Sequence, residues 1–147
     1  MDAQVKKYWA EFLERTNRSQ ETACFEVFYF DSSEQAANQL LALVLAGKKT
    51  ATASLVDEYE VIPQVGDVSI VTDYQGNPAC IIETTDVQRM KFHEMTEDIC
   101  QREGEDDTLA SWQKSHRAFF TERSKHLSTT FSDDSELLFE DFVVIYQ

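Results

Sequence analysis

The strongest constraint on the fold is a pair of β-rich segments separated by a turn sequence. Residues 68–72 and 79–87 are rich in Val, Ile and Thr, which favour β-strands. Between them, DYQGNP (residues 73–78) contains the residue types that favour a tight reversal of the chain. The pattern predicts a β-hairpin, and therefore a sheet in which neighbouring strands are mostly antiparallel.

Helices and further strands are predicted on both sides of this hairpin. Apolar residues from Val5 to Leu13 have the spacing of one helix face and predict an N-terminal helix. Residues 31–33 can cap a second helix, with Ser32 and Gln35 as a capping box, and Gly47 can end it. The remaining predicted elements are helices over residues 96–102 and after Thr108, and strands over residues 24–30, 50–56 and 137–146.

Together these elements predict an α+β fold, a small and mostly antiparallel β-barrel flanked by helices. The length of 147 residues fits one domain. A hydrophobic content of 42% and an aromatic content of 12% are enough for a packed core.

The acidic balance of the chain restricts its partners. There are 27 Asp and Glu residues against 13 Lys and Arg residues, which gives a formal net charge of −14. Because a field of this sign repels polyanions, RNA is a disfavoured partner, whereas a small neutral ligand is allowed.

The cysteines and the apolar runs indicate the compartment. Cys24, Cys80 and Cys100 are widely spaced without a CxxC pair, which is typical of reduced thiols. The N-terminus lacks the apolar core of a signal peptide, and the longest apolar run, residues 40–46, is too short to span a bilayer. We therefore expect a soluble, cytoplasmic protein with no membrane partner.

The segment GKKTAT (residues 47–52) follows the predicted end of the second helix. It is not a phosphate-binding P-loop, because that motif requires Gly where this chain has Ala42 and Ser or Thr where it has Lys49. Lys49 and Thr52 would lie on opposite faces of a regular strand, but they can converge across a helix-to-strand turn. The simpler interpretation is a solvated Lys and a strand-forming Thr.

No metal or cofactor is expected. His93 and Glu94 match half of a zinc-protease helix, but the second His of that motif is missing. None of the three His residues has ligand spacing from a Cys.

Four carboxylates between Glu103 and Asp107 precede the helix predicted after Thr108. A helix dipole stabilises carboxylates at its N-terminus, so a solvated cap is the simplest interpretation of this cluster. On the helix, His116 is either a partly buried side chain or a ligand-facing donor at the edge of a cleft. Its aromatic neighbours are expected in the core: Trp112, Phe119 and Phe120.

Four separated blocks resemble the ASCH domain family of the PUA-like superfamily over about residues 24–146. They are LAGKKTATASL (45–55), PQVGDVSIVTDYQGNPACIIETTDV (63–87), EGEDDTLASWQKSHRAFF (103–120) and FEDFVVI (139–145). The resemblance implies a PUA-like β-barrel with a cleft beside the glycine-lysine segment. It also implies a division into an N-terminal helical extension (1–22) and an ASCH domain (23–147).

The resemblance also implies a catalytic set. A smaller bacterial member removes the acetyl group from acetylated cytidine with a Lys, a Thr and a Glu. Its Lys and Thr lie in a GxKTxT segment that corresponds to residues 47–52 here, so Lys49 and Thr52 match. Its Glu precedes a Thr-Leu pair by three residues, as Glu105 does here. One departure is Ser54, where that member has Arg.

For amide hydrolysis we assign Thr52 as the nucleophile, Lys49 as its base in the neutral form, and Glu105 as the group that orients Lys49 and shuttles a proton to the leaving amine. Further predicted ligand-binding residues are Lys48, Thr50, Ser54, Tyr59 and His116. One alternative is an RNA-binding or RNA-cleaving module, which would use Lys48, Lys49, Arg89, Lys91 and Tyr59. A second is a ligand-binding domain without turnover.

Overall fold

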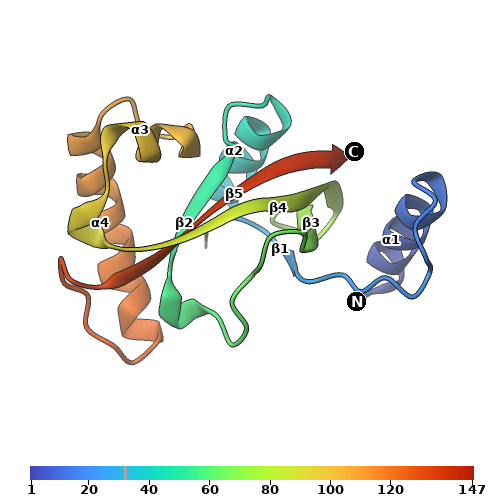
Figure 1. Cartoon of the computed structure of the whole chain (residues 1–147), viewed down its shortest axis with the longest axis horizontal. Coiled ribbons are helices and arrows are strands. Elements are labelled where there is room, and N and C mark those ends of the chain that lie inside the picture. Colours follow the sequence, from blue (N-terminus) through green and yellow to red (C-terminus); the bar gives the residue numbers. More distant parts are fainter. Residues whose placement is uncertain (32) are drawn as a thin grey trace.

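The computed structural model describes residues 1–31 and 33–147, in which helices pack on both faces of one twisted sheet (Figure 1). The strands are β1 (Val27–Phe28), β2 (Ala51–Leu55), β3 (Val68–Thr72), β4 (Pro78–Lys91) and β5 (Glu136–Tyr146). The α-helices are α1 (Ala3–Arg15), α2 (Glu34–Leu45), α3 (Glu97–Cys100) and α4 (Leu109–His126). Three short 3-10 helices complete the described elements: η1 (Val56–Glu58), η2 (Phe92–Glu94) and η3 (Gln101–Glu103).

The strand order is β1-β3-β4-β5-β2. The predicted hairpin is confirmed as β3 and β4, and every neighbouring pair is antiparallel except β1 with β3. β4 extends to Lys91, beyond the predicted end at residue 87, because its second half pairs with β5. β1 is shorter than predicted, since only Val27 and Phe28 pair with β3.

The prediction of a barrel is wrong, because the described sheet is open. Closure would require the two edge strands, β1 and β2, to pair with each other. In the described residues each pairs on one side only, β1 with β3 and β2 with β5. The α+β class itself is confirmed.

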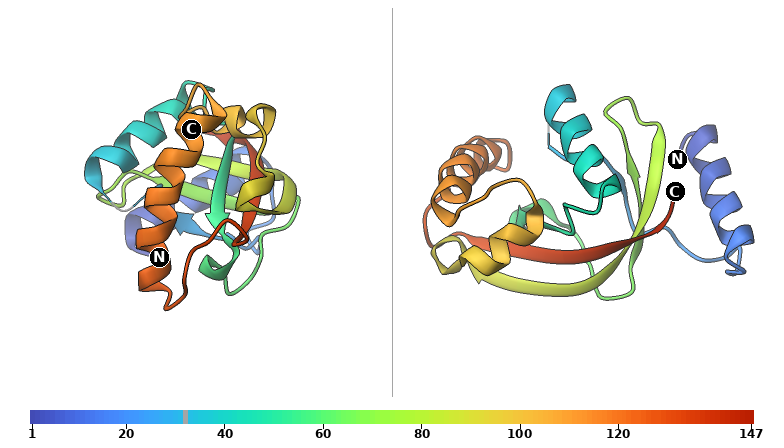
Figure 2. Two further views of the ribbon diagram at one scale, coloured as in Figure 1. Left: turned by 90° about the vertical axis from the view of Figure 1, so that its left-hand side faces the viewer. Right: turned by 90° about the horizontal axis from the view of Figure 1, so that it is seen from above.

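Figure 2 shows the helices around the sheet in two further views. Three apolar clusters join the helices to the sheet. α1 packs on β3 and β4 through Val5 and Phe12, whereas α2 packs through Leu41 on side chains from the other face of these strands. α4 contributes Trp112 and Phe120 to the cluster that includes β2 and β5. The sheet thus spaces α2 and α4 along its length.

The predicted helix boundaries agree with the caps. Ser33 and Thr108 accept hydrogen bonds from the third backbone N–H that follows each of them, at α2 and α4 respectively. Gly47, with φ of 76°, follows α2 as expected. The capping box at Ser32 lies outside the described residues. No described helix is long and apolar enough to cross a membrane.

Candidate active site

A cavity of about 740 Å³ is lined by side chains from β1, β2, η1, α4 and the segment between η3 and α4. Six of the predicted site residues line it: Lys49, Thr52, Ser54, Tyr59, Glu105 and His116. Lys48 and Thr50 are exposed and are not in the described lining, so the structure does not bring them into the site. Thr50 instead ties two segments together, since its backbone N–H and its hydroxyl both donate to the carbonyl of Arg102.

Lys49 lies between the end of α2 and the start of β2, and its side chain is only 1% exposed. Its Nζ donates to Oε2 of Glu105 at 2.7 Å and to the carbonyl of Ala51 at 2.8 Å, and lies 3.4 Å from Oε2 of Glu103. Three acceptors match the three donors of an ammonium group. The interpretation of Lys49 as a solvated side chain is therefore wrong.

Glu103 is the second carboxylate at Lys49, and its side chain is 2% exposed. Its Oε1 accepts a hydrogen bond from the indole Nε1 of Trp112 at 2.6 Å. Its Oε2 accepts one from the backbone N–H of Ala53 at 3.2 Å, in addition to the contact with Lys49. The interpretation of the acidic cluster as a solvated cap is therefore wrong for Glu103, which is a fully buried, hydrogen-bonded anion.

The pKa values of Glu103 and Glu105 are shifted in opposite directions. Burial alone raises the pKa of Glu103, but Lys49 and the hydrogen bonds from His116 and Trp112 outweigh it and lower the pKa to about 2. Burial also raises the pKa of Glu105, where Lys49 opposes the rise and the charge of Glu103 adds to it. The pKa of Glu105 stays raised despite its shorter contact with Lys49, because Glu105 lacks the hydrogen bonds from His116 and Trp112 that Glu103 accepts.

This difference predicts acid sensitivity. Because the pKa of Glu103 is lowered on folding, its contribution to stability is present above about pH 4.5 and is lost as the pH falls towards 2. The full loss is on the order of 3 kcal/mol, at about 1.4 kcal/mol per unit. Chemical denaturation should show that the unfolding free energy falls less between pH 7 and pH 3 for Glu103→Gln than for wild type. An equal loss in both proteins would contradict the assignment.

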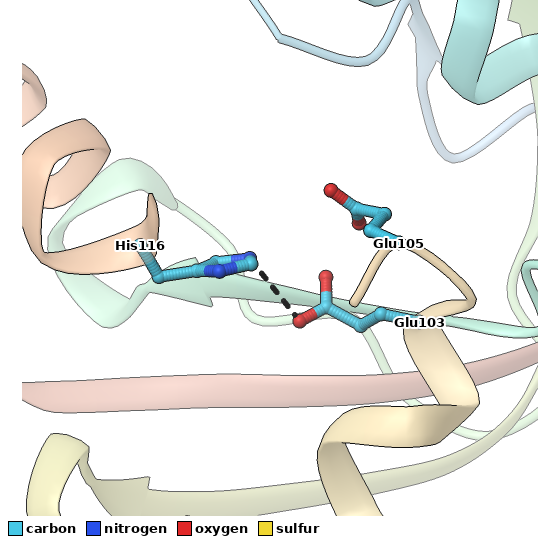
Figure 3. A group of neighbouring side chains, drawn as sticks. All are labelled: Glu103, Glu105 and His116. Atoms are coloured by element: carbon cyan, nitrogen blue, oxygen red, sulfur yellow. Dashed lines mark ion pairs between the residues drawn. The ribbon is translucent and has the colours of Figure 1, made fainter. Parts of the chain in front are cut away.

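His116 completes the buried cluster from α4 (Figure 3). Its ring stacks on Trp112 with centroids 4.3 Å apart, and its Nδ1 lies 3.0 Å from the Trp112 carbonyl. Its Nε2 lies 3.4 Å from Oε1 of Glu103, the contact marked in the figure. Since both nitrogens face acceptors, the imidazolium form fits best. Burial lowers the pKa of His116, but its contacts with Glu103 outweigh this effect and raise it.

Thr52 and Ser54 line the cavity from β2. They alternate along the strand with Ala51, Ala53 and Leu55, which belong to the apolar cluster that includes α4. β2 begins at Ala51, which leaves Lys49 in the preceding turn and free to reach the same cavity as Thr52. The Thr52 hydroxyl makes no hydrogen bond to any described residue and remains open to a ligand.

Gly104 separates the two carboxylates and lies against the lysine segment. It has φ of 71°, and a Cβ at this position would lie 2.3 Å from the carbonyl oxygen of Lys48. Only glycine therefore allows η3 to approach closely enough for Glu103 and Glu105 to meet Lys49.

Gly104→Ala should destabilise the protein more than Gly66→Ala. Gly66 also has positive φ, at 96°, but nothing lies within 4 Å of an added Cβ, so this variant measures the backbone strain alone. We expect Gly104→Ala to cost about 1–3 kcal/mol beyond Gly66→Ala, the usual range for overpacking. Equal unfolding free energies for the two variants would show that the close approach is unimportant.

Glu103, Glu105 and His116 place one possible ligand atom each within 4.8 Å of one another. However, the ammonium of Lys49 already contacts both carboxylates, and both oxygens of Glu103 accept hydrogen bonds. A cation here would have to displace Lys49. We therefore assign no metal to this cluster.

Among the lining residues that sequence reasoning missed are Glu58, Glu103 and Arg123. Glu58 and Arg123 form a bidentate ion pair between η1 and α4, with Nη2 of Arg123 3.0 Å from Oε2 of Glu58. The local sequence predicts a solvated cap at Glu103, whereas Gly104, the predicted helix stop that follows it, permits the close approach to the lysine segment. No comparable signal marks the ion pair, whose members are far apart in the chain.

Comparisons with known proteins agree on the family. The model of the ASCH domain matches residues 26–146. The crystal structure of an ASCH domain from Lactobacillus crispatus JV V101 is 35% identical, with a TM-score of 0.89 over 100% of this chain and 97% of that chain. The crystal structure of protein EF3133 from Enterococcus faecalis V583 is 33% identical, with a TM-score of 0.92 over 99% of this chain and 90% of that chain. No match was found among curated proteins. The chain belongs to the ASCH domain family.

Proposed function

We propose that the protein is an amidohydrolase that removes an acyl group from the amine of a modified cytidine or a similar small ligand. One observation carries the proposal: buried Lys49 contacts Glu105 at 2.7 Å in the same cavity that presents the Thr52 hydroxyl. Amide hydrolysis needs a nucleophile, a base to activate it and an acid for the leaving amine. These three residues supply one group for each task.

The ion pair between Lys49 and Glu105 gives a route for the protons. Lys49 first passes a proton to Glu105, a transfer that the raised pKa of this carboxyl favours. Neutral Lys49 then accepts the hydroxyl proton of Thr52 as the oxygen attacks the amide carbon. Protonated Glu105 donates to the leaving amine, which breaks the C–N bond and restores the ion pair. Water completes the cycle by releasing the acyl group from Thr52.

Glu103 and His116 have a positioning role in this scheme. Glu103 lies 3.4 Å from Nζ of Lys49 and is itself fixed by Trp112 and Ala53. Its charge also helps to raise the pKa of Glu105. The buried anion thus holds the lysine in place and makes Glu105 a better proton acceptor.

The cavity and the family resemblance support the same class of ligand. A volume of about 740 Å³ lies within the usual range for small-molecule sites. Lys49, Thr52 and Glu105 correspond to the catalytic set of the acetylcytidine amidohydrolase that the sequence resembles. Ser54 stands where that amidohydrolase has Arg. We therefore propose a wider substrate class than acetylcytidine alone.

RNA binding is the alternative that the family allows, but the cations available for it are few. Lys49 is buried, and Arg89 is paired with Glu136 at 2.6 Å. The net charge of −14 opposes a polyanion further.

The experiment that tests the proposal is incubation of the pure protein with N4-acetylcytidine and other acylated nucleosides, with chromatography of the products. We expect release of the free nucleoside. Salt-sensitive retention of RNA without nucleoside release would favour the alternative. Thermal stabilisation by a nucleoside without product would indicate a binding domain.

A further inference from the structure

Arg123 lines the cavity and is held there in an ion pair with Glu58. Apart from Lys49, Arg123 is the only Lys or Arg side chain in the described lining. Glu58 accepts hydrogen bonds from both its Nε and its Nη2. Arginine recognises phosphate through the same paired N–H groups. Glu58 takes two of the five N–H donors of Arg123 and balances its charge, so the pair offers a phosphate no net positive charge.

His116, a further cation of the lining, is already paired with Glu103, and the lining also holds further carboxylates. Glu26 and Glu140 also line the cavity, and burial is the main cause of the raised pKa of each. The charge of Glu58 adds to the rise at Glu26. Tyr59 follows η1 in the same lining, and burial, with these three carboxylates, raises its pKa. A phosphate entering here would meet these carboxylates and a guanidinium whose charge Glu58 already balances.

Lys49 does not offer a phosphate a free positive charge. All three of its acceptors are protein groups, two of them carboxylates. A phosphate could bind Lys49 only by displacing a buried carboxylate, which would leave an uncompensated charge in the interior.

We propose that Glu58 sets the charge selectivity of the cavity: by holding Arg123, it makes the site accept uncharged nucleosides and reject their phosphorylated forms. The inference rests on the proposed function for the kind of ligand, and it extends that function to a substrate class, the free nucleoside rather than the nucleotide. It also assigns a specificity role to a residue outside the Lys49, Thr52 and Glu105 set.

Calorimetric titration with cytidine and cytidine 5′-monophosphate tests this selectivity without requiring turnover. Wild type should bind cytidine at least about tenfold more tightly than the monophosphate. Glu58→Gln should free Arg123 and strengthen binding of the monophosphate by about tenfold or more, the effect of one charge-assisted hydrogen bond. Glu58→Gln combined with Arg123→Gln should lose this gain.

The matched control is Glu60→Gln, which changes the net charge by the same amount at an exposed residue outside the described lining. It should leave the preference for cytidine unchanged. Equal gains in Glu58→Gln and Glu60→Gln would overturn the proposal, because net charge alone would then explain them. Equal binding of both ligands by wild type would overturn it even if Glu58→Gln did not fold. Absence of binding of both ligands by every protein would overturn it too.

These results are distinguishable from failure of the proposed function. Selective binding of cytidine without hydrolysis of acetylcytidine would support the charge selectivity and contradict the amidohydrolase. Hydrolysis of acetylcytidine and of its 5′-monophosphate at equal kcat/KM would support the enzyme and contradict the selectivity.

Discussion

Thr52→Ala is expected to reduce the kcat for hydrolysis of acetylcytidine by a factor of about 10³ or more, with little change in fold. The hydroxyl is the proposed nucleophile, and removal of a nucleophile eliminates the covalent route. It makes no hydrogen bond to any described residue, so its loss breaks no described polar contact. Steady-state kinetics and thermal unfolding of the same preparation would test both expectations.

Thr50→Ala is the matched control for this variant. It removes the same atoms two residues away, where Thr50 is exposed and hydrogen-bonds the carbonyl of Arg102. Its kcat should be close to that of wild type. Equal activity of Thr52→Ala and wild type would refute the nucleophile assignment, and equal losses in both variants would indicate a structural effect on β2.

Lys49→Met should have the largest effect on stability. It leaves Glu103 as a buried anion without its main cationic partner, and breaking a buried ion pair in this way typically costs about 3–5 kcal/mol. The melting temperature should fall on the order of 10 °C for a chain of this size. Differential scanning calorimetry at pH 7 measures this directly.

Two further variants identify the cause of that loss. Lys48→Met changes the neighbouring exposed lysine and should alter the unfolding free energy by no more than about 0.5 kcal/mol. Adding Glu103→Gln to Lys49→Met should recover part of the stability, because the stranded charge is removed. If Lys49→Met were as stable as Lys48→Met, the buried ion pair would not contribute to the fold.

The sequence was most informative where structure depends on local chemistry. The bounds of β3 were predicted correctly, because strand formers and turn residues alternate within one short segment. Thr108 and Gly47 were placed correctly for the same reason, since caps and stops act within one turn of a helix. The convergence of Lys49 and Thr52 on one cavity also followed from a local feature, the helix-to-strand turn.

Errors arose where distant residues decide the outcome. Closure of a sheet depends on whether its two edge strands meet, and no local pattern encodes this for β1 and β2. The burial of Glu103 depends on Lys49 and Ala53, which lie more than about a third of the chain away. Local rules for carboxylates near a helix therefore predicted a solvated side chain.

Release of cytidine from N4-acetylcytidine by the purified wild-type protein tests the central claim most directly. The proposed site predicts cytidine and acetate in equal amounts, formed at a rate far above that of Thr52→Ala purified in the same way. No release from any acylated cytidine, or equal release by Thr52→Ala, would contradict an amidohydrolase built on Lys49, Thr52 and Glu105.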